Sequence, residues 1–299
     1  HFWSEPMAIF NALNARSGLK IYANKNVAQP IYILNVITES NALAANSHQV
    51  SIAENAELTL IENFVTTTDD AVCFTANTDI AIAKHGRLQQ VVMQGLNEES
   101  FYFKNQFIHQ AQASSLNTFF TSLGANVSRH QNHLLMDGER IESIQNSACI
   151  ATGKQTVDSR TNTAHKDVTG LSRQLHKFVL DQQAVGVFNG MIGVDQKAQQ
   201  TDGQMDNKNL VLSNKAKMNT KPQLEIYADD VACSHGSATG QIDENQVFYL
   251  QARGISKASA IQVITQAFVL EPLEHIHANE IKHWVEQAVT KRLAQVQKG

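Results

Sequence analysis

A short stretch near the C-terminal end, residues 221–240, holds the densest set of side chains in this chain that are able to bind a metal ion. Four of them follow one another closely: Asp229, Asp230, Cys233 and His235. Cysteine thiolate and neutral imidazole are good ligands for iron, zinc and iron–sulfur clusters. Carboxylates can add oxygen ligands or orient a metal-bound histidine. This stretch is therefore the candidate functional site.

The spacing of Cys233 and His235 suits one shared site if the stretch is extended. On a strand, residues i and i+2 point to the same face, with Cα atoms about 6.6 Å apart. Leu224 and Ile226 alternate with polar neighbours and predict a strand, and Gly236 is a turn signal. We expect the Cys-Ser-His triplet at the end of the last strand.

Two ligands are fewer than such a site usually needs, since clusters and closed zinc sites take four protein ligands. One chain offering Cys233 and His235 therefore suggests that a second chain completes the set. The plainer interpretation is a buried cysteine beside a hydrogen-bonded surface histidine, and spacing alone leaves it open. Cys73 and Cys149 lie in apolar runs and are expected to be buried.

Composition narrows the class of protein. The chain has 299 residues, ordinary hydrophobic content and a formal charge of −4, which argue against a disordered chain, a membrane protein or a nucleic-acid binder. No apolar run approaches the ~20 residues that span a bilayer. Three widely spaced cysteines make a poor disulfide framework and fit a reduced, cytoplasmic protein. The first residues show no signal peptide and no initial Met, so we expect a fragment that lacks an upstream segment.

The elements that must position the site are mostly strands. From about residue 31 to residue 194, short β-type segments follow one another without helical periodicity. A sandwich or a closed barrel is possible, but the length of the strand region favours a β-solenoid. Abundant asparagine is expected at the corners, because Asn tolerates the left-handed conformation. The glycine-rich segment 186–190 also reads as a corner.

Beyond Gly240 the pattern becomes helical. Asp243 is a candidate N-cap of a helix that stops at Gly254, and Ser256 can cap a second helix that ends near residue 271. A third helix is expected from about residue 278 to residue 296, with one apolar face. We therefore divide the chain into a β-solenoid core, residues 1–240, and a helical C-terminal domain, residues 241–299. These helices could cap the solenoid, dock another protein, or do both.

Catalytic motifs do not stand out. The chain has no GxSxG elbow, P-loop, GxGxxG or HExxH. Parallel β-solenoids also include polysaccharide lyases and hydrolases, which need carboxylates along a groove. The strand region contains few acidic residues and no secretion signal is visible, so a carbohydrate enzyme is the weaker alternative.

Several long segments resemble one protein family. Residues 172–177, 185–190, 199–204 and 207–213 are similar to the SufB/SufD family of iron–sulfur cluster assembly proteins. The similarity sharpens over Thr-Lys-Pro-Gln-Leu-Glu-Ile-Tyr-Ala-Asp-Asp-Val-Ala-Cys-Ser-His-Gly, residues 220–236, and continues through residues 240–244 and 248–255. The segments from residue 220 to residue 255 resemble the SufD branch in particular.

The resemblance implies a right-handed parallel β-helix followed by a helical C-terminal domain. It also implies a complex of SufB, SufD and the ABC-type ATPase SufC, in which the SufB and SufD β-helices pair through their C-terminal strands. The nascent cluster would form at that junction, with His235 as a ligand and Cys233 as the nearby thiol. SufC would dock on the C-terminal helices. Known members also carry an N-terminal helical segment, which this sequence does not show.

These observations lead to one expectation and one alternative. We expect a cytoplasmic, non-enzymatic scaffold subunit whose metal-binding residues are His235 and Cys233 and which binds iron or an Fe–S cluster transiently, shared with a partner chain. No nucleotide is expected to bind this chain, and neither nucleic acid nor a membrane is an expected partner. In isolation the chain could form a homodimer through its strand edges. The alternative is a purely structural adaptor that holds SufB and SufC without metal.

Overall fold

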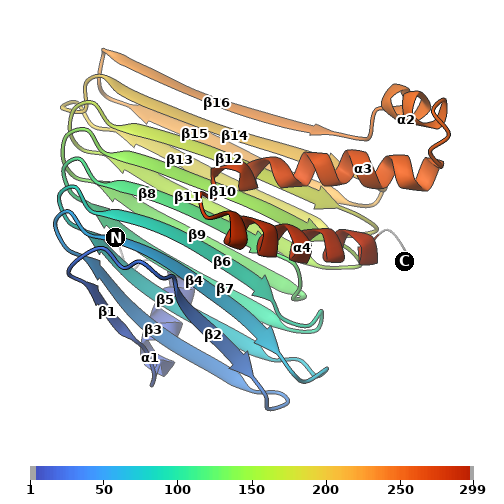
Figure 1. Ribbon diagram of the computed structural model, residues 1–299, viewed down its shortest axis with the longest axis horizontal. Helices are drawn as coiled ribbons and strands as arrows, with labels where there is room; N and C mark the ends of the chain where they lie inside the picture. The colour runs from blue at the N-terminus through green and yellow to red at the C-terminus, as the bar shows by residue number, and fades with distance from the viewer. Residues whose placement is uncertain (1–4, 297–299) are drawn as a thin grey trace.

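The chain winds into a solenoid of two parallel β-sheets that face each other (Figure 1). The computed structural model describes residues 5–296. Sheet A contains the odd-numbered strands in sequence order: β1 (Lys20–Ala23), β3 (Leu43–Ile52), β5 (Cys73–Ile82), β7 (Phe101–Gln110), β9 (Val127–Met136), β11 (Thr156–His165), β13 (Val185–Val194) and β15 (Lys217–Ile226).

Sheet B contains the even-numbered strands, again in sequence order from one end of the solenoid to the other. They are β2 (Ile31–Ile37), β4 (Glu57–Thr66), β6 (Arg87–Gly95), β8 (Ser115–Ser122), β10 (Glu142–Ala151), β12 (Leu171–Leu180), β14 (Thr201–Val211) and β16 (Val231–Gly240). Each turn of the solenoid therefore adds one strand to each sheet. This confirms the predicted parallel β-solenoid, and its right-handed winding stays a prediction.

The turns of the solenoid differ in length. Paired residues of neighbouring strands are 26 positions apart for Phe101 and Val127 but 32 apart for Val185 and Lys217. Variable corners absorb the difference while the strands stay in parallel register. This explains why the sequence shows the succession of short strands typical of a solenoid but no repeat of fixed length.

The corners are not built as the asparagine content suggested. Positive φ angles occur at Asn41 and Asn55, but also at His85, Ala113 and Arg140. Most of the other asparagines lie inside strands, where several are buried and hydrogen-bonded. Residues 186–190 are likewise part of β13 rather than a corner. A side chain at Gly190 would stand 2.1 Å from the Met205 sulfur, so the glycine makes room across the core.

The space between the two sheets is partly polar. Its most buried charges are Lys104 and Glu62, which form a 2.8 Å salt bridge with both side chains fully inaccessible. Buried polar side chains continue the hydrogen bonding across several turns of the solenoid: Thr78, Gln90, Gln106, Thr118, Asn132, Gln145, Thr161, Thr163, Gln174 and His176. Such pairing lowers the cost of burying polar groups.

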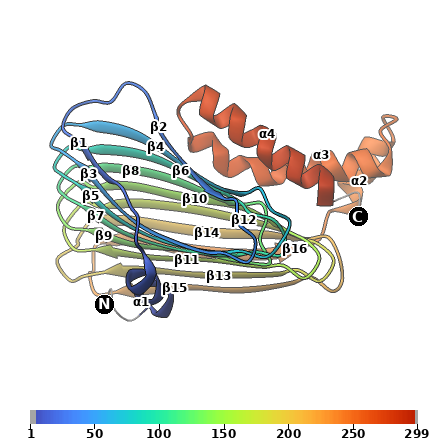
Figure 2. The same ribbon diagram turned by 90° about the horizontal axis from the view of Figure 1, so that it is seen from below.

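A helix near the N-terminus was missed by the sequence analysis. Pro6–Asn14 forms α1, which starts with proline, where its missing N–H does no harm. The helix lies against the outer face of sheet A (Figure 2). Asn11 donates to Thr75 Oγ1 at 2.9 Å, and Asn77 donates to the carbonyl oxygen of Ala8 at 3.0 Å. These tertiary contacts stabilise a segment too short to be helical by itself.

The predicted C-terminal helices are present. They are α2 (Glu244–Gln251), α3 (Lys257–Leu270), the 3-10 helix η2 (Glu271–His275) and α4 (Asn279–Val296). The Asp243 side chain accepts from the Asn245 amide, and Ser256 accepts from the Ser259 amide, as N-caps do. Gly254 has a φ of +84° just beyond α2, the conformation expected of a helix-ending glycine.

Helices α3 and α4 lie side by side over the outer face of sheet B (Figures 1 and 2). Val285 and Val289 of α4 are fully buried in an apolar cluster that includes Ile150 and Val179 of sheet B. Lys177 of β12 pairs with Glu271, and its ammonium group lies 4.2 Å from the centre of the Phe268 ring. The helices thus cover one side of the solenoid.

The last strand ends at Gly240 and the next helix starts at Glu244, but a division into two domains there stays a prediction. Residues 1–4, part of the stretch in which no signal peptide is predicted, and residues 297–299 lie outside the described residues. No helix between residues 5 and 296 combines the length and apolar character needed to cross a bilayer.

Buried histidines predict that acid destabilises the solenoid. Burial lowers the pKa of His165 to about 4 and that of His176 to about 3. In the unfolded chain both titrate near 6.5, so below that pH the unfolded state binds protons that the native state excludes. The free energy of unfolding should therefore fall as the pH falls from 6.5. His165 alone should lower it by on the order of 3 kcal/mol by pH 4.

Urea unfolding between pH 7 and pH 4 measures this slope. His165→Gln should flatten it, whereas His283→Gln, at an exposed position on α4, should leave it unchanged. An equal slope in all three proteins would contradict the assignment.

Candidate functional site

Strand β16 carries Cys233 and His235 and is the last strand of sheet B. It pairs with β14 on one side, and it lies at the C-terminal end of the solenoid (Figure 1). The position of the triplet differs from the prediction. The Cys-Ser-His triplet lies within a further strand, not at the exit of the strand 217–226, and Gly236 continues that strand instead of turning it.

Both candidate ligands lie on the inner face of β16. Parallel register pairs Cys233 with Gly203 and His235 with Met205, and Met205 is buried between the sheets. Two residues further along the same face, the Ser237 hydroxyl donates to Thr220 Oγ1 of β15 at 3.1 Å. Cys233 and His235 therefore face the interior at its open end, where no further turn of the solenoid covers them among the described residues.

The two side chains differ in their surroundings. Cys233 is half-buried against the core, next to Gly203 of β14. Burial raises the pKa of the Cys233 thiol, the Asp202 carboxylate raises it further, and the Gly203 backbone hydrogen bond opposes them. Since a metal ligand must be the thiolate, a cation or a partner's positive charge has to favour ionisation. His235 is exposed.

The two aspartates lie in the corner before β16, where Asp230 is held by backbone hydrogen bonds. The Asp230 amide donates to Gln199 Oε1 at 2.9 Å, and its carbonyl accepts from the Gln200 amide at 2.6 Å. Asp229 and Asp230 are both exposed in the bend. Across residues 5–296, no three or more His, Cys, Asp and Glu side chains come together in a group that could hold a metal ion. What the described chain offers is therefore the pair Cys233 and His235.

The other two cysteines have different roles. Cys149 is fully buried, and burial raises its pKa to about 12, as expected of a core thiol. Cys73 is half-buried at the start of β5, so the burial predicted for it is only partial. No disulfide joins these three cysteines.

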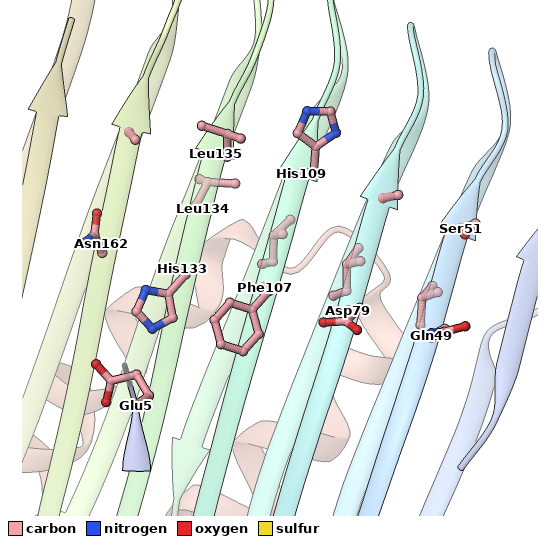
Figure 3. A pocket seen from close by; sticks show the side chains of 15 residues that line it. Glu5, Gln49, Ser51, Asp79, Phe107, His109, His133, Leu134, Leu135 and Asn162 are labelled. Carbon is pink, nitrogen blue, oxygen red and sulfur yellow. The ribbon is translucent and has the colours of Figure 1, made fainter. Parts of the chain in front are cut away.

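A wide hollow lies elsewhere, on the outer face of sheet A next to α1. It has a volume of about 730 Å³ and is lined by Glu5, Asp79, His109 and His133, among others (Figure 3). His133 stacks on Phe107 with ring centres 4.9 Å apart. Asp79 Oδ1 is buried without a hydrogen-bond partner among the described residues, and burial raises the pKa of this carboxyl. The hollow includes neither candidate ligand, and sequence spacing gave no signal of it.

Comparison with known proteins gives the family. The family description "SUF system FeS cluster assembly, SufBD core domain" matches residues 35–268, which is most of the chain. The chain belongs to the SufB/SufD family. It is 36% identical to the iron–sulfur cluster assembly protein SufD of Escherichia coli (strain K12), over 89% of this chain and 64% of that protein.

Other relatives support the same assignment. The SufBD family protein slr0076 of Synechocystis is 30% identical over 91% of this chain and 62% of its own length. SufD of Bacillus subtilis (strain 168) is 22% identical over 96% of this chain and 67% of its own length. The similarity to SufD proteins places the chain in the SufD branch, as its motifs predicted. The chain spans somewhat less than two thirds of the length of SufD from Escherichia coli.

Proposed function

We propose that this chain is a SufD-like scaffold subunit of a SUF-type iron–sulfur cluster assembly complex. Cys233 and His235 would supply part of an iron or cluster site, and SufB would supply the rest. The observation that carries the proposal is the position of this pair on the inner face of the last strand. Family membership supports a role in iron–sulfur cluster assembly, since SufD of Escherichia coli is described as an iron–sulfur cluster assembly protein.

The open end of the solenoid suits a shared site. β15 and β16 end their sheets, so each has an edge whose backbone groups can pair with another chain. A SufB strand added there would cover His235 and bring further ligands to Cys233. In isolation, a second copy of this chain would use the same edges. Iron or the nascent cluster is cargo in this proposal, held transiently across the interface.

The C-terminal helices would dock the SufC ATPase, which would hydrolyse ATP, so this chain itself would be no enzyme. Phe248 and Tyr249 of α2 and Val263 of α3 are exposed apolar side chains, an arrangement typical of an interaction surface. Tyr249→Glu should therefore reduce the amount of SufC that co-purifies, with helix content unchanged by circular dichroism. Undiminished SufC binding would place its docking surface elsewhere.

The alternative is a structural adaptor that joins SufB and SufC without binding metal. Two observations favour it: burial raises the pKa of the Cys233 thiol, and the described chain adds no third ligand. In that case β16 would provide only an edge for pairing.

Reconstitution of the complex separates the two functions. His235→Ala should lower the yield of assembled cluster at least about tenfold, since losing even an outer-shell partner of a metal ligand costs roughly 10- to 100-fold. Cys233→Ser should give a smaller loss. The complex itself should still form, as size-exclusion chromatography would show.

Ser234→Ala is the matched control. It changes the residue between the two ligands, whose side chain alternates to the other face of β16. Full cluster yield with His235→Ala would support the adaptor and remove the metal-site proposal.

A further inference from the structure

Strand β14, which borders β16, carries two buried asparagines, Asn207 and Asn209. The positions in register with them on the preceding turn are His176 and Phe178 of β12. In sheet B, one inward-facing row runs through Cys149 and Phe178 to Asn209, and register then pairs Asn209 with Thr239 of β16. The core thus changes from apolar side chains to an amide at the strand that borders β16. Asn207 and Asn209 are almost completely buried. A buried amide is costly unless its donors and acceptors are used.

The two amides bond to each other reciprocally. Asn207 Nδ2 donates to Asn209 Oδ1 at 2.9 Å, and Asn209 Nδ2 donates back to Asn207 Oδ1 at 2.7 Å. Asn207 Nδ2 is also anchored to the carbonyl oxygen of His176 in β12, at 3.2 Å. The amide pair is therefore fixed to the body of the solenoid.

The same pair holds the last strand. Asn209 Nδ2 donates to the Ala238 carbonyl oxygen at 3.2 Å and lies 3.1 Å from Thr239 Oγ1. From the other sheet, Thr220 accepts from Ser237. An edge strand is paired on one side and frays more readily than a central strand, so such side-chain bonds add to its backbone ladder.

We propose that Asn207 and Asn209 are positioning residues that hold β16 in place, and with it Cys233 and His235. They act through the strand and need not touch the metal or cluster. The functional meaning rests on the proposed role of that pair, but the positioning itself is a property of the isolated chain. Without the amide pair, the C-terminal half of β16, residues 236–240, would fray from β14, and the half-buried thiol of Cys233 would become more accessible.

Two measurements on the folded, isolated chain test the proposal. Hydrogen exchange of residues 231–240 reports the strand, and native alkylation by iodoacetamide reports the Cys233 thiol. Asn209→Leu should speed both by about tenfold, the effect of losing a typical buried hydrogen bond. Cys149 and the amides of β10 and β12 should be unaffected. Asn219→Leu, at an exposed position of β15, is the matched control.

Thr239→Val is the milder variant if Asn209→Leu does not fold, and it should speed exchange of residues 231–240 by roughly threefold. Unchanged exchange and alkylation in a folded variant would overturn the proposal. Equal acceleration in β10 and β12 would also overturn it, because the asparagines would then stabilise the solenoid generally. Neither readout depends on cluster assembly, so failure here is distinct from failure of the metal site.

Discussion

Lys104→Met should destabilise the chain by about 3–5 kcal/mol, the cost of leaving one partner of a buried ion pair uncompensated. Glu62 would then lie in the solenoid interior without its 2.8 Å ammonium partner. It would keep only neutral partners such as the Gln90 amide. The measurement is urea unfolding followed by circular dichroism at pH 7.

The double variant Lys104→Met/Glu62→Gln is the control. It removes both charges and leaves an amide that can still bond to its neighbours, so it should recover most of the lost stability. If the double variant were as unstable as Lys104→Met, lost packing and not the unpaired carboxylate would explain the effect.

Val285→Asp is expected to release α4 from the solenoid. Val285 is fully buried in the apolar cluster between α4 and sheet B, where a carboxylate finds no described partner. Losing the apolar burial and desolvating the carboxylate should together cost about 4 kcal/mol or more. Because α3 and α4 pack together, trypsin should cut residues 257–296 rapidly in this variant while the strands stay protected.

Gln287→Asp places the same carboxylate on the exposed side of α4, two residues away. It should leave the digestion pattern and the helix content as in the wild type. Equal protection of the helices in Val285→Asp would mean that the α4 contact with sheet B contributes little.

The strands and the C-terminal helices could be predicted from the sequence because they follow from local patterns. Alternating segments gave the strands, and Asp243, Gly254 and Ser256 marked the helix ends where the structure has them. Helix α1 could not be found in this way, because its bonds to Thr75 and Asn77 connect segments more than 60 residues apart. The prediction that asparagines mark the corners was wrong for most of them for a related reason. Whether an Asn lies at a corner or in the polar interior depends on the strands packed around it.

The candidate site was predicted in part. The i, i+2 spacing placed Cys233 and His235 on one face, and the structure adds that this face points inward. Spacing could not indicate that Asp230 uses its backbone groups in the corner. It also could not indicate the partners of β16, since Asn209 and Thr239 meet only through the register of separate strands.

Coordination by His235 is the central claim, and isotope-edited spectroscopy tests it most directly. This chain, with ¹⁵N-labelled histidine, is assembled with unlabelled SufB and SufC, and the reconstituted cluster is reduced to a paramagnetic state for pulsed electron paramagnetic resonance. We predict a strongly coupled ¹⁵N nucleus in the wild-type complex that disappears in His235→Ala. A cluster of full yield with no coupled ¹⁵N in the wild-type complex would contradict the account.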